Sequence, residues 1–452
     1  MDSKKHQMIE GVIWKQLILF FIPILLGTFF QQFYNMVDAI ILGQFAGKNA
    51  LAAIESTAAL IRLILNLFVG ISTGATIIIS QFYGANNHDS VKKTTHTAYL
   101  FAIIGGCILT VFGLLVAPSL LGIINIPKEI INMSILYIRI YFLGSIGSLV
   151  YNIGAGILRA IGDSKRPFYF LVASCVLNIV LDYIFVALFH WNVFGVAFAT
   201  AIAQWCSAIL VTLVLMKSNE SCRLILKELK IDMAILKKIF YIGIPIGLQS
   251  AMYSISNVIV QSSVNSFGTT VIAGWALAGK MDSFIWMVIE AFSVTLSTFV
   301  AQNYGAKNYQ RLQKGVNLTI VFDVIVIGMI SLFLFIFAGV IGRLFISDKE
   351  VIAIGKDLYR FCAPLYFSFV WGDLYATTIR ATGESVKPTI ITMIGTCLLR
   401  ILWILLVVPF DKNNIYLVIG CYPITWIITS LLFTFYYYKY KKQTLDHQIL
   451  VA

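Results

Sequence analysis

Residues 159–167 read Arg-Ala-Ile-Gly-Asp-Ser-Lys-Arg-Pro, and residues 380–388 read Arg-Ala-Thr-Gly-Glu-Ser-Val-Lys-Pro. The two stretches lie 221 positions apart, and other pairs recur in the same order at nearly the same offset. These pairs are Ile22-Pro23 with Ile244-Pro245, and Gln81-Phe82-Tyr83-Gly84-Ala85 with Gln302-Asn303-Tyr304-Gly305-Ala306. Self-similarity at one offset predicts that the chain consists of two homologous halves.

The composition excludes a water-soluble protein. Of the 452 residues, 59% are hydrophobic and only 12% are charged, too few to cover the outside of a soluble domain. The seven cysteines are scattered without any CxxC spacing, so they predict packing residues and no disulfide framework. With a water-soluble protein and a disulfide scaffold excluded, the composition predicts a membrane protein.

Long apolar stretches predict the membrane spans. A helix needs about 20 predominantly apolar residues to cross a bilayer. The stretches lack the alternation of a membrane β-barrel, so we expect an all-α polytopic membrane protein. The twelve predicted spans cover 17–42, 51–80, 97–118, 130–158, 167–189, 194–216, 237–265, 271–301, 315–341, 351–379, 388–410 and 415–438.

Six spans in each half predict two homologous six-helix lobes of the same orientation, related by a pseudo-twofold axis along the membrane normal. The N-terminal lobe is expected at 1–216 and the C-terminal lobe at 237–440. The polar stretch 217–236 is the predicted cytoplasmic linker, and 441–452 is the predicted cytoplasmic tail. Two such lobes around a central cleft suit transport by alternating access.

Basic residues predict the orientation. The two termini and the even-numbered connections carry 22 Lys and Arg, whereas the odd-numbered connections carry six. Basic loops stay in the cytoplasm, so both termini are expected there, in a prokaryotic plasma membrane. The net charge of +12 is thus a topology signal, and no nucleic-acid partner is expected.

The sequence offers no sign of an enzyme, a cofactor or a structural metal. The stretch Gly274–Met281 resembles a phosphate-binding loop, but Met281 replaces the Ser or Thr that holds Mg²⁺, and the stretch lies in an apolar span. The five histidines lack metal-ligand spacing, and no nucleophile–base arrangement stands out. We therefore expect no enzyme activity, no cofactor and no ATP as energy source.

Polar residues share helical faces in three predicted spans of the first half. Ionisable groups inside a bilayer face protein or water. A poorly solvated carboxylate beside a second one holds a proton more readily than in water, as a proton-coupled carrier requires. The residues that share faces are Gln31, Asn35 and Asp38, then Asn178 and Asp182, then Thr200 and Gln204.

Other residues complete the expected site. Pro23 and Pro245 each remove a backbone hydrogen bond and are expected to kink their helices. Glu290 and Asp373 are the candidates in the second half for attracting a cationic substrate, with Gln31, Asn35 and Gln204 as further lining residues. Aromatic residues make up 14% of the chain and suit flat organic cations.

The chain resembles the multidrug and toxic compound extrusion (MATE) transporters over nearly its whole length. The resemblance rests on the duplicated layout, on Tyr34-Asn35-Met36-Val37-Asp38, on Leu177–Asp182, on Gly195–Thr200 and on the two repeated loops. It implies ion-driven export of organic cations and amphiphilic toxic compounds. The pattern is closest to the DinF-like branch, which implies a proton site at Asp38, Asn178, Asp182 and Thr200. A sodium ion at Asp38, Asp182 and Asn178 remains an alternative.

The NorM-like branch has acidic residues in the C-terminal lobe, but the corresponding stretch Gly247–Asn257 contains no carboxylate here. We therefore expect a monomeric antiporter in the lipid bilayer that exports organic cations and drugs in exchange for protons or sodium. The alternative is a flippase for lipid-linked precursors or other amphiphiles. An intramembrane enzyme and a non-transporting scaffold are further rivals that the residues favour less.

Overall fold

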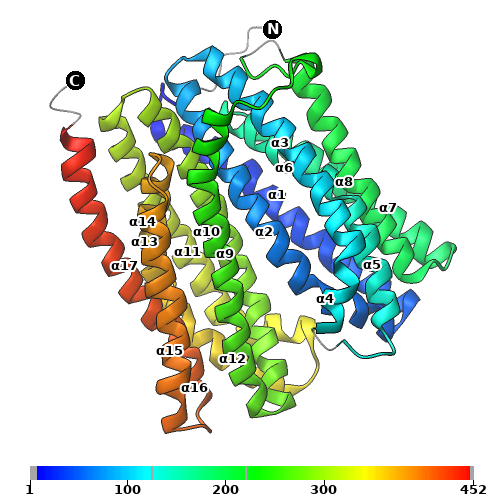
Figure 1. Ribbon diagram of the computed structural model, residues 1–452. Helices are drawn as coiled ribbons and strands as arrows, with labels where there is room; N and C mark the ends of the chain where they lie inside the picture. Colours follow the sequence, from blue (N-terminus) through cyan, green and yellow to red (C-terminus); the bar gives the residue numbers. More distant parts are fainter. Residues whose placement is uncertain (1–7, 124–125, 219–220, 448–452) are drawn as a thin grey trace. The chain divides into compact units, whose positions relative to one another are not determined.

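The computed structural model describes residues 8–123, 126–218 and 221–447, and their regular structure is entirely helical (Figure 1). The helices of the first half are α1 (Ile13–Ile41), α2 (Lys48–Gly84), α3 (His88–Leu115), α4 (Ala117–Ile123), α5 (Ile131–Leu143), α6 (Ser145–Ala160), α7 (Lys165–Asp182) and α8 (Asn192–Lys217). Those of the second half are α9 (Met233–Val264), α10 (Thr269–Gly305), α11 (Tyr309–Phe345), α12 (Lys349–Cys362), α13 (Phe367–Ala381), α14 (Val386–Thr392), α15 (Leu399–Leu406), α16 (Ile415–Ile419) and α17 (Cys421–Tyr440).

Short π-helical and 3₁₀ segments extend or join these helices. The π-helical segments are η1 (Leu42–Ala46), η2 (Tyr183–Leu188), η6 (Met393–Leu398) and η8 (Lys441–Leu445). The 3₁₀ segments are η3 (Leu226–Glu228), η4 (Asn265–Phe267), η5 (Ala363–Leu365) and η7 (Val408–Phe410). A π-helical turn inside a longer helix commonly marks a functional position, and η2 begins directly after Asp182.

The all-helical membrane fold is confirmed, but the count of spans differs from twelve. In the described residues, 10 helices are long and apolar enough to cross a membrane, and the count rises to 11 if α5 and α6, bent by 45°, are one span. The predicted span 351–379 is divided among α12, η5 and α13. Helix α12 has only 14 residues, and five of them are charged, so it is too short and too polar to count as one apolar crossing. The charged residues are Lys349, Glu350, Lys356, Asp357 and Arg360.

The internal repeat is visible in the backbone at the helix ends. Asn87 caps α3 by accepting from Ser90 N at 3.0 Å, and Asn308 caps α11 by accepting from Arg311 N at 3.2 Å. In the repeated loops, Gly162 and Gly383 have φ values of 94° and 107°, where an L side chain is strained. The recurring asparagines and glycines therefore preserve the same turns in both halves.

The helices form two compact units. The first contains Leu19–Gly247, and the second contains Met8–Ile18 together with the chain from Leu248 onward. The start of α1 thus belongs to the second unit, whereas the start of α9 belongs to the first.

Within the first unit, α2 and α9 cross at very short distance through glycines. A Cβ atom added at Gly243 would lie 2.5 Å from the Ile71 Cα atom, and one at Gly70 would lie 2.4 Å from the Gly247 nitrogen. Helices in membranes associate closely through small residues of this kind. These glycines therefore set the approach of the two helices.

The linker also packs on the first unit. Its Ile225 N–H donates to His96 Nε2 of α3 at 3.1 Å, and Asp232 N–H donates to Thr97 Oγ1 at 3.1 Å. Lys92 and Glu228 form an exposed ion pair at 2.6 Å, and the Lys92 ammonium lowers the pKa of the Glu228 carboxyl.

The second unit holds the beginning of the described chain and an apolar core. Arg311 of α11 donates to the carbonyl oxygens of Met8, Glu10 and Gly11 at 3.1, 2.8 and 2.7 Å. Gln302 of α10 accepts from Met8 N–H at 3.2 Å. The apolar core joins α9, α15, η7, α16 and α17 through Val260, Val264, Ile404, Val408, Val418 and Cys421.

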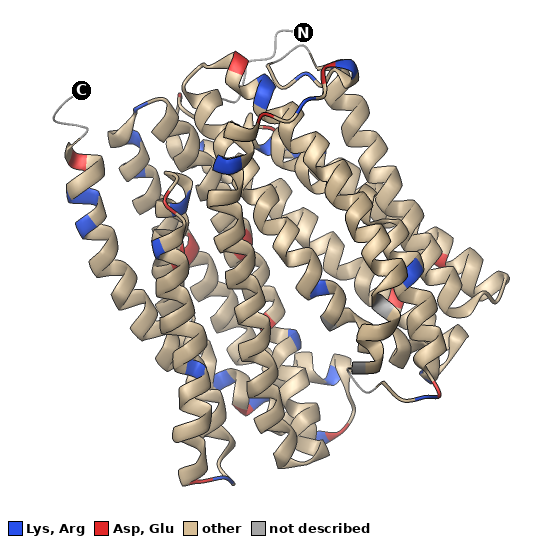
Figure 2. Cartoon of the chain, viewed as in Figure 1, with Lys and Arg blue, Asp and Glu red and all other residues tan. Residues whose placement is uncertain are grey.

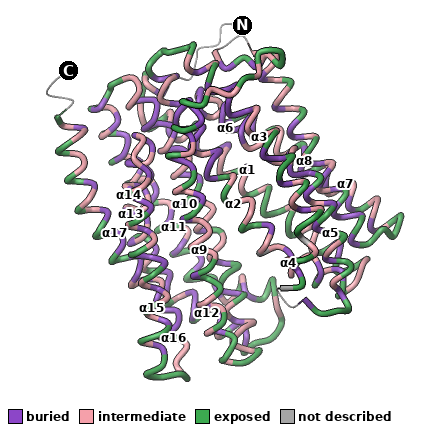
Figure 3. The backbone as a smooth tube through the Cα atoms, viewed as in Figure 1, coloured by how far each residue is buried: buried purple, intermediate pink, exposed green. Residues whose placement is uncertain are grey.

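The surface pattern agrees with a bilayer as solvent. Figure 2 shows that charged residues concentrate towards helix ends and connections, with few along the helices. Figure 3 shows long exposed stretches on the helices, and many of these positions on α11 are large and apolar, among them Leu332, Phe333, Ile336 and Val340. A row of exposed apolar side chains on a helix fits contact with lipid tails.

Candidate functional site

Two aspartates of the first unit meet although 144 positions separate them. Asp38 lies in α1 and Asp182 is the last residue of α7, and their carboxyl groups lie close enough to interact electrostatically. Asp182 is fully buried, and none of the described N–H or hydroxyl groups donates to its oxygens. Two carboxyl groups form a hydrogen bond only when one of them carries a proton. The geometry therefore suits one proton shared by the pair.

Asn178 completes this carboxyl pair from the preceding turn of α7. With its amide nitrogen turned toward Asp38, it donates to Oδ1 at 3.1 Å and to Oδ2 at 3.3 Å. The residue is 1% exposed, and Asn178 and Asp182 share a helix face because four residues separate them. Three of the four predicted coupling residues therefore lie together.

The fourth predicted coupling residue, Thr200, and the other predicted polar residues form no described hydrogen bond with the carboxyl pair. Thr200 Oγ1 donates to Val196 O of its own helix at 2.9 Å. Gln204 lies beside Gly144, where an added Cβ would come 2.1 Å from its Oε1 atom. Gln31 and Asn35 are exposed on α1. Neither Gln31 nor Asn35 contacts the carboxyl pair through a described hydrogen bond.

Two tyrosines, Tyr34 and Tyr137, lie near the pair, and a third, Tyr141, lies near these two; none of the three is a predicted site residue. Tyr34 of α1 and Tyr137 and Tyr141 of α5 lie within electrostatic range of the pair or of one another. The rings of Tyr137 and Tyr141 are 5.8 Å apart. Tyr34 lies one turn before Asp38 and begins the motif Tyr34–Asp38, and these two sequence signals point to it.

The prolines lie inside helices that continue on both sides. Pro23 is within α1, and Pro245 is within α9. Each removes one backbone donor from its helix. The predicted kinks at these positions stay predictions.

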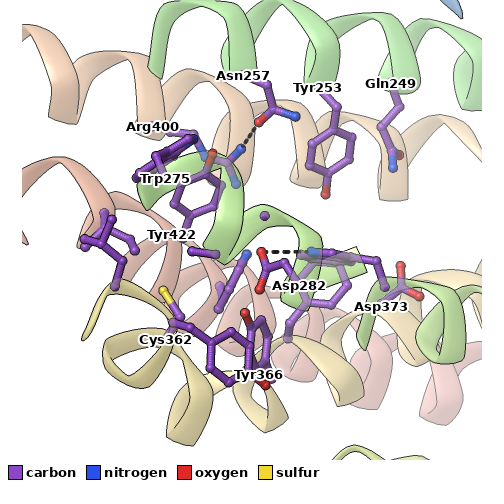
Figure 4. Close-up of a pocket in the computed structure, with 18 residues that line it drawn as sticks. Gln249, Tyr253, Asn257, Trp275, Asp282, Cys362, Tyr366, Asp373, Arg400 and Tyr422 are labelled. Carbon is purple, nitrogen blue, oxygen red and sulfur yellow. Dashed lines mark hydrogen bonds between the residues drawn. The ribbon is translucent and has the colours of Figure 1, made fainter. Parts of the chain in front are cut away.

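A second site is a cavity of about 500 Å³ in the second unit (Figure 4). Asp373 of α13 lines it and accepts from Ser293 Oγ at 2.5 Å. Asp282 of α10 also lines it and accepts from Trp286 Nε1 at 3.4 Å. Glu290, the other predicted residue of this half, is not among the lining residues. Asp282 was visible in the sequence as a charge inside an apolar span, but its role was not predicted.

Two arginines accompany these carboxylates. Arg400 of α15 lines the cavity, donates to Asn257 Oδ1 at 2.8 Å, and places its guanidinium carbon 4.3 Å from the centre of the Tyr422 ring. Arg380 of α13 donates to Gln249 Oε1 at 2.7 Å and lies within electrostatic range of Asp373. The cavity therefore combines both signs of charge with aromatic walls.

Neither site resembles a structural metal centre. Among the described residues, no three His, Cys, Asp or Glu side chains are grouped so that they could hold a metal ion. Asp38, Asp182 and Asn178 supply oxygen atoms, which are the ligands that hard cations prefer.

Comparisons with known proteins agree with the duplicated architecture. The MatE family matches the chain twice, over residues 23–184 and 245–406, at the same offset of 222 as the two Ile-Pro pairs. "Probable multidrug resistance protein YoeA" from Bacillus subtilis (strain 168) is 27% identical over 97% of this chain and 96% of its own length. "Multidrug export protein MepA" from Staphylococcus haemolyticus (strain JCSC1435) is 22% identical over 89% of each chain.

Solved structures match the fold over the full length. The structure described as "Crystal structure of MATE in the bent conformation" superposes with a TM-score of 0.91 at 21% identity, covering 100% of this chain and 99% of the other. A structure described as an outward-facing multidrug resistance MATE family transporter matches with the same TM-score. The chain therefore belongs to the MatE family, whose members are membrane transporters that couple to ion gradients and are not enzymes.

Proposed function

We propose that this transporter exports organic cations and amphiphilic drugs in exchange for protons, and that the Asp38–Asp182 pair couples the two movements. The observation that carries the proposal is the close approach of two carboxyl groups, with Asn178 donating to Asp38 and with Asp182 fully buried. Loss of the proton places two like charges side by side, which favours separation of α1 from α7. The names of the relatives, which include multidrug resistance and multidrug export, support the substrate class.

A coupling site in the first half matches the DinF-like branch, and we propose that assignment. The support is the convergence of Asp38, Asn178 and Asp182, with Thr200 on the neighbouring helix α8. Sodium is the second candidate ion, since the same three residues supply oxygen donors.

The proposed orientation places both termini in the cytoplasm. Its support is the excess of Lys and Arg at the termini and in the even-numbered connections. The proposed lobes remain 1–216 and 237–440, with 217–236 as linker. The location is a prokaryotic plasma membrane, and the functional unit is a monomer.

The proposed cycle begins with a proton that enters from outside. The proton neutralises Asp38 or Asp182, α1 bends at Pro23, and the protein loses affinity for the substrate, which leaves. The lobes then turn to the cytoplasm, where the proton departs. One charge that moves through 100 mV is worth roughly 2.3 kcal/mol, which sustains a gradient of roughly fifty-fold for a neutral substrate. Exchange of one proton for a monovalent cation is electroneutral and uses only the pH difference.

The decisive experiment is ethidium transport in vesicles that contain the purified protein, with pH and sodium gradients imposed separately. We expect transport with the pH gradient alone, and at least a tenfold lower rate in Asp38→Asn. Glu129→Gln, an exposed carboxyl outside the spans, is the matched control and keeps the normal rate. Normal transport by a folded Asp38→Asn protein contradicts the coupling role, whereas transport with sodium alone reassigns the ion.

A further inference from the structure

The cavity of the second unit holds an arginine that the fold does not neutralise. Arg400 is 3% exposed and lines the cavity. The ion pairs of the described residues all involve other side chains. None of these residues therefore places a carboxylate oxygen within 4.0 Å of the Arg400 nitrogens. A buried charge without a counter-charge is strongly unfavourable. Arg400 therefore lacks the carboxylate that such a group requires.

The present partners of Arg400 are neutral and leave part of the guanidinium unsatisfied. Nη1 donates to Asn257, and the group stacks over Tyr422. Nε is buried and has no acceptor. A planar guanidinium binds a carboxylate through two parallel hydrogen bonds, which a single amide oxygen cannot replace.

The carboxylates of the cavity differ in how well they are satisfied. Asp373 accepts a short hydrogen bond from Ser293 and has Arg380 within electrostatic range. The described donor to Asp282 is Trp286, at the long distance of 3.4 Å. Asp282 is therefore the more available partner for a positive charge.

Aromatic side chains form the walls between these charges (Figure 4). Trp286 lies 4.9 Å from Phe369 and 5.9 Å from Trp426, measured between ring centres. Tyr422 lies 6.0 Å from Trp426. Such walls hold a flat aromatic body by apolar burial and cation–π contact. A volume of about 500 Å³ is enough for a small drug.

We infer that this cavity binds aromatic zwitterions, with the ligand carboxylate on Arg400 and the ligand cation near Asp282. The inference deepens the proposed function, on which it rests, by adding a carboxylate requirement at a site away from the coupling pair. A purely cationic ligand leaves Arg400 unpaired and meets its repulsion. Recognition of both charges thus selects zwitterions over cations of the same shape.

Rhodamine 110 and rhodamine 123 test the inference, since they differ only in a free carboxylate against its methyl ester. Fluorescence anisotropy with the purified full-length protein in detergent measures both affinities without any gradient. We expect rhodamine 110 to bind at least tenfold more tightly. Failure of this preference therefore leaves the coupling proposal intact, and failure of coupling leaves this measurement unaffected.

Variants locate the preference. Arg400→Gln is expected to remove the preference by weakening rhodamine 110 and by relieving the repulsion of rhodamine 123, and Arg400→Lys is expected to retain part of it. Asp282→Asn weakens both dyes, because both carry the cation. Gly279 lines the cavity and has no atom within 4 Å of an added Cβ, so Gly279→Phe is expected to block both dyes. Arg343→Gln, on the exposed end of α11, is the matched control.

Three outcomes overturn the inference. The first is wild-type protein that binds both dyes equally, a result that does not depend on any variant folding. The second is an Arg400→Gln protein, normal in size-exclusion chromatography, that weakens both dyes to the same extent. The third is a folded Gly279→Phe protein that keeps the preference for rhodamine 110, which places that binding elsewhere.

Discussion

Asp38 and Asp182 are the same residue type in different surroundings. Asp38 is half-buried and receives the amide of Asn178, whereas Asp182 is fully buried and neither of its oxygens accepts a hydrogen bond from the described residues. When a proton is shared, neither carboxyl can be removed without changing the other. At this scale we propose that the pair titrates as one unit.

A double-variant comparison tests this unity. Asp38→Asn and Asp182→Asn are each expected to reduce proton-driven ethidium transport at least tenfold, because either change removes the shared proton. The double variant is expected to lose no more than the more impaired single variant, since the second change has nothing left to break. Losses that multiply in the double variant indicate two independent roles and contradict the shared site.

At the scale of elements, recurring small residues decide how helices meet and turn. Gly162 and Gly383 adopt left-handed backbone conformations at equivalent loops. Gly70, Gly74, Gly243 and Gly247 instead keep negative φ values and matter because α2 and α9 cross without room for a side chain. Glycine thus permits a left-handed backbone in the loops, and it permits the close approach of two helices at the crossing.

Replacement of Gly243 tests the crossing. Gly243→Val is expected to destabilise the protein by about 1–3 kcal/mol, since its Cβ overlaps Ile71 and forces the backbones apart. Gly328→Val of α11 is the control, because nothing lies within 4 Å of a Cβ there. Thermal loss of the monodisperse peak in size-exclusion chromatography measures both. Equal stability of the two variants rules out tight packing at this crossing.

At the scale of the whole molecule, α1 begins in one compact unit and ends in the other. Its first residues belong with α10 and α11, where Arg311 and Gln302 bind the preceding backbone. The contacts of Arg311 set one end of that helix.

Removal of the Arg311 contacts tests this arrangement. Arg311→Gln loses three hydrogen bonds to carbonyl groups, each worth about 1.5–3 kcal/mol for a charged donor and less where water reaches it. We expect hydrogen exchange in the peptide 8–18 to become at least roughly tenfold faster, at 1.4 kcal/mol per factor of ten. Lys314→Gln, exposed on the same helix, controls for the lost charge. Unchanged exchange shows that other contacts hold the segment.

Much of the architecture was readable from residue order. Paired motifs at offsets of 221 and 222 predicted the duplication, and the same offset separates the two matches to the MatE family. Apolar length predicted most spans, but it failed at 351–379, where charges and the break at η5 interrupt the crossing. Hydropathy measures transfer into lipid, so it cannot distinguish one long helix from two short ones at a protein-lined site.

The candidate sites, too, were predictable from the sequence only in part. Helical spacing placed Asn178 and Asp182 on one face of a helix, because that relation depends on local geometry alone. Three relations followed only from the packed helices: α7 meets α1, Tyr34 and Tyr137 lie near the carboxyl pair, and Asp282 and Arg400 share a cavity. An ionisable residue inside an apolar span is energetically costly in a bilayer, so the sequence alone identifies it as a candidate functional residue. Which charges face each other depends on contacts between distant segments, and these arise from packing that no local pattern encodes.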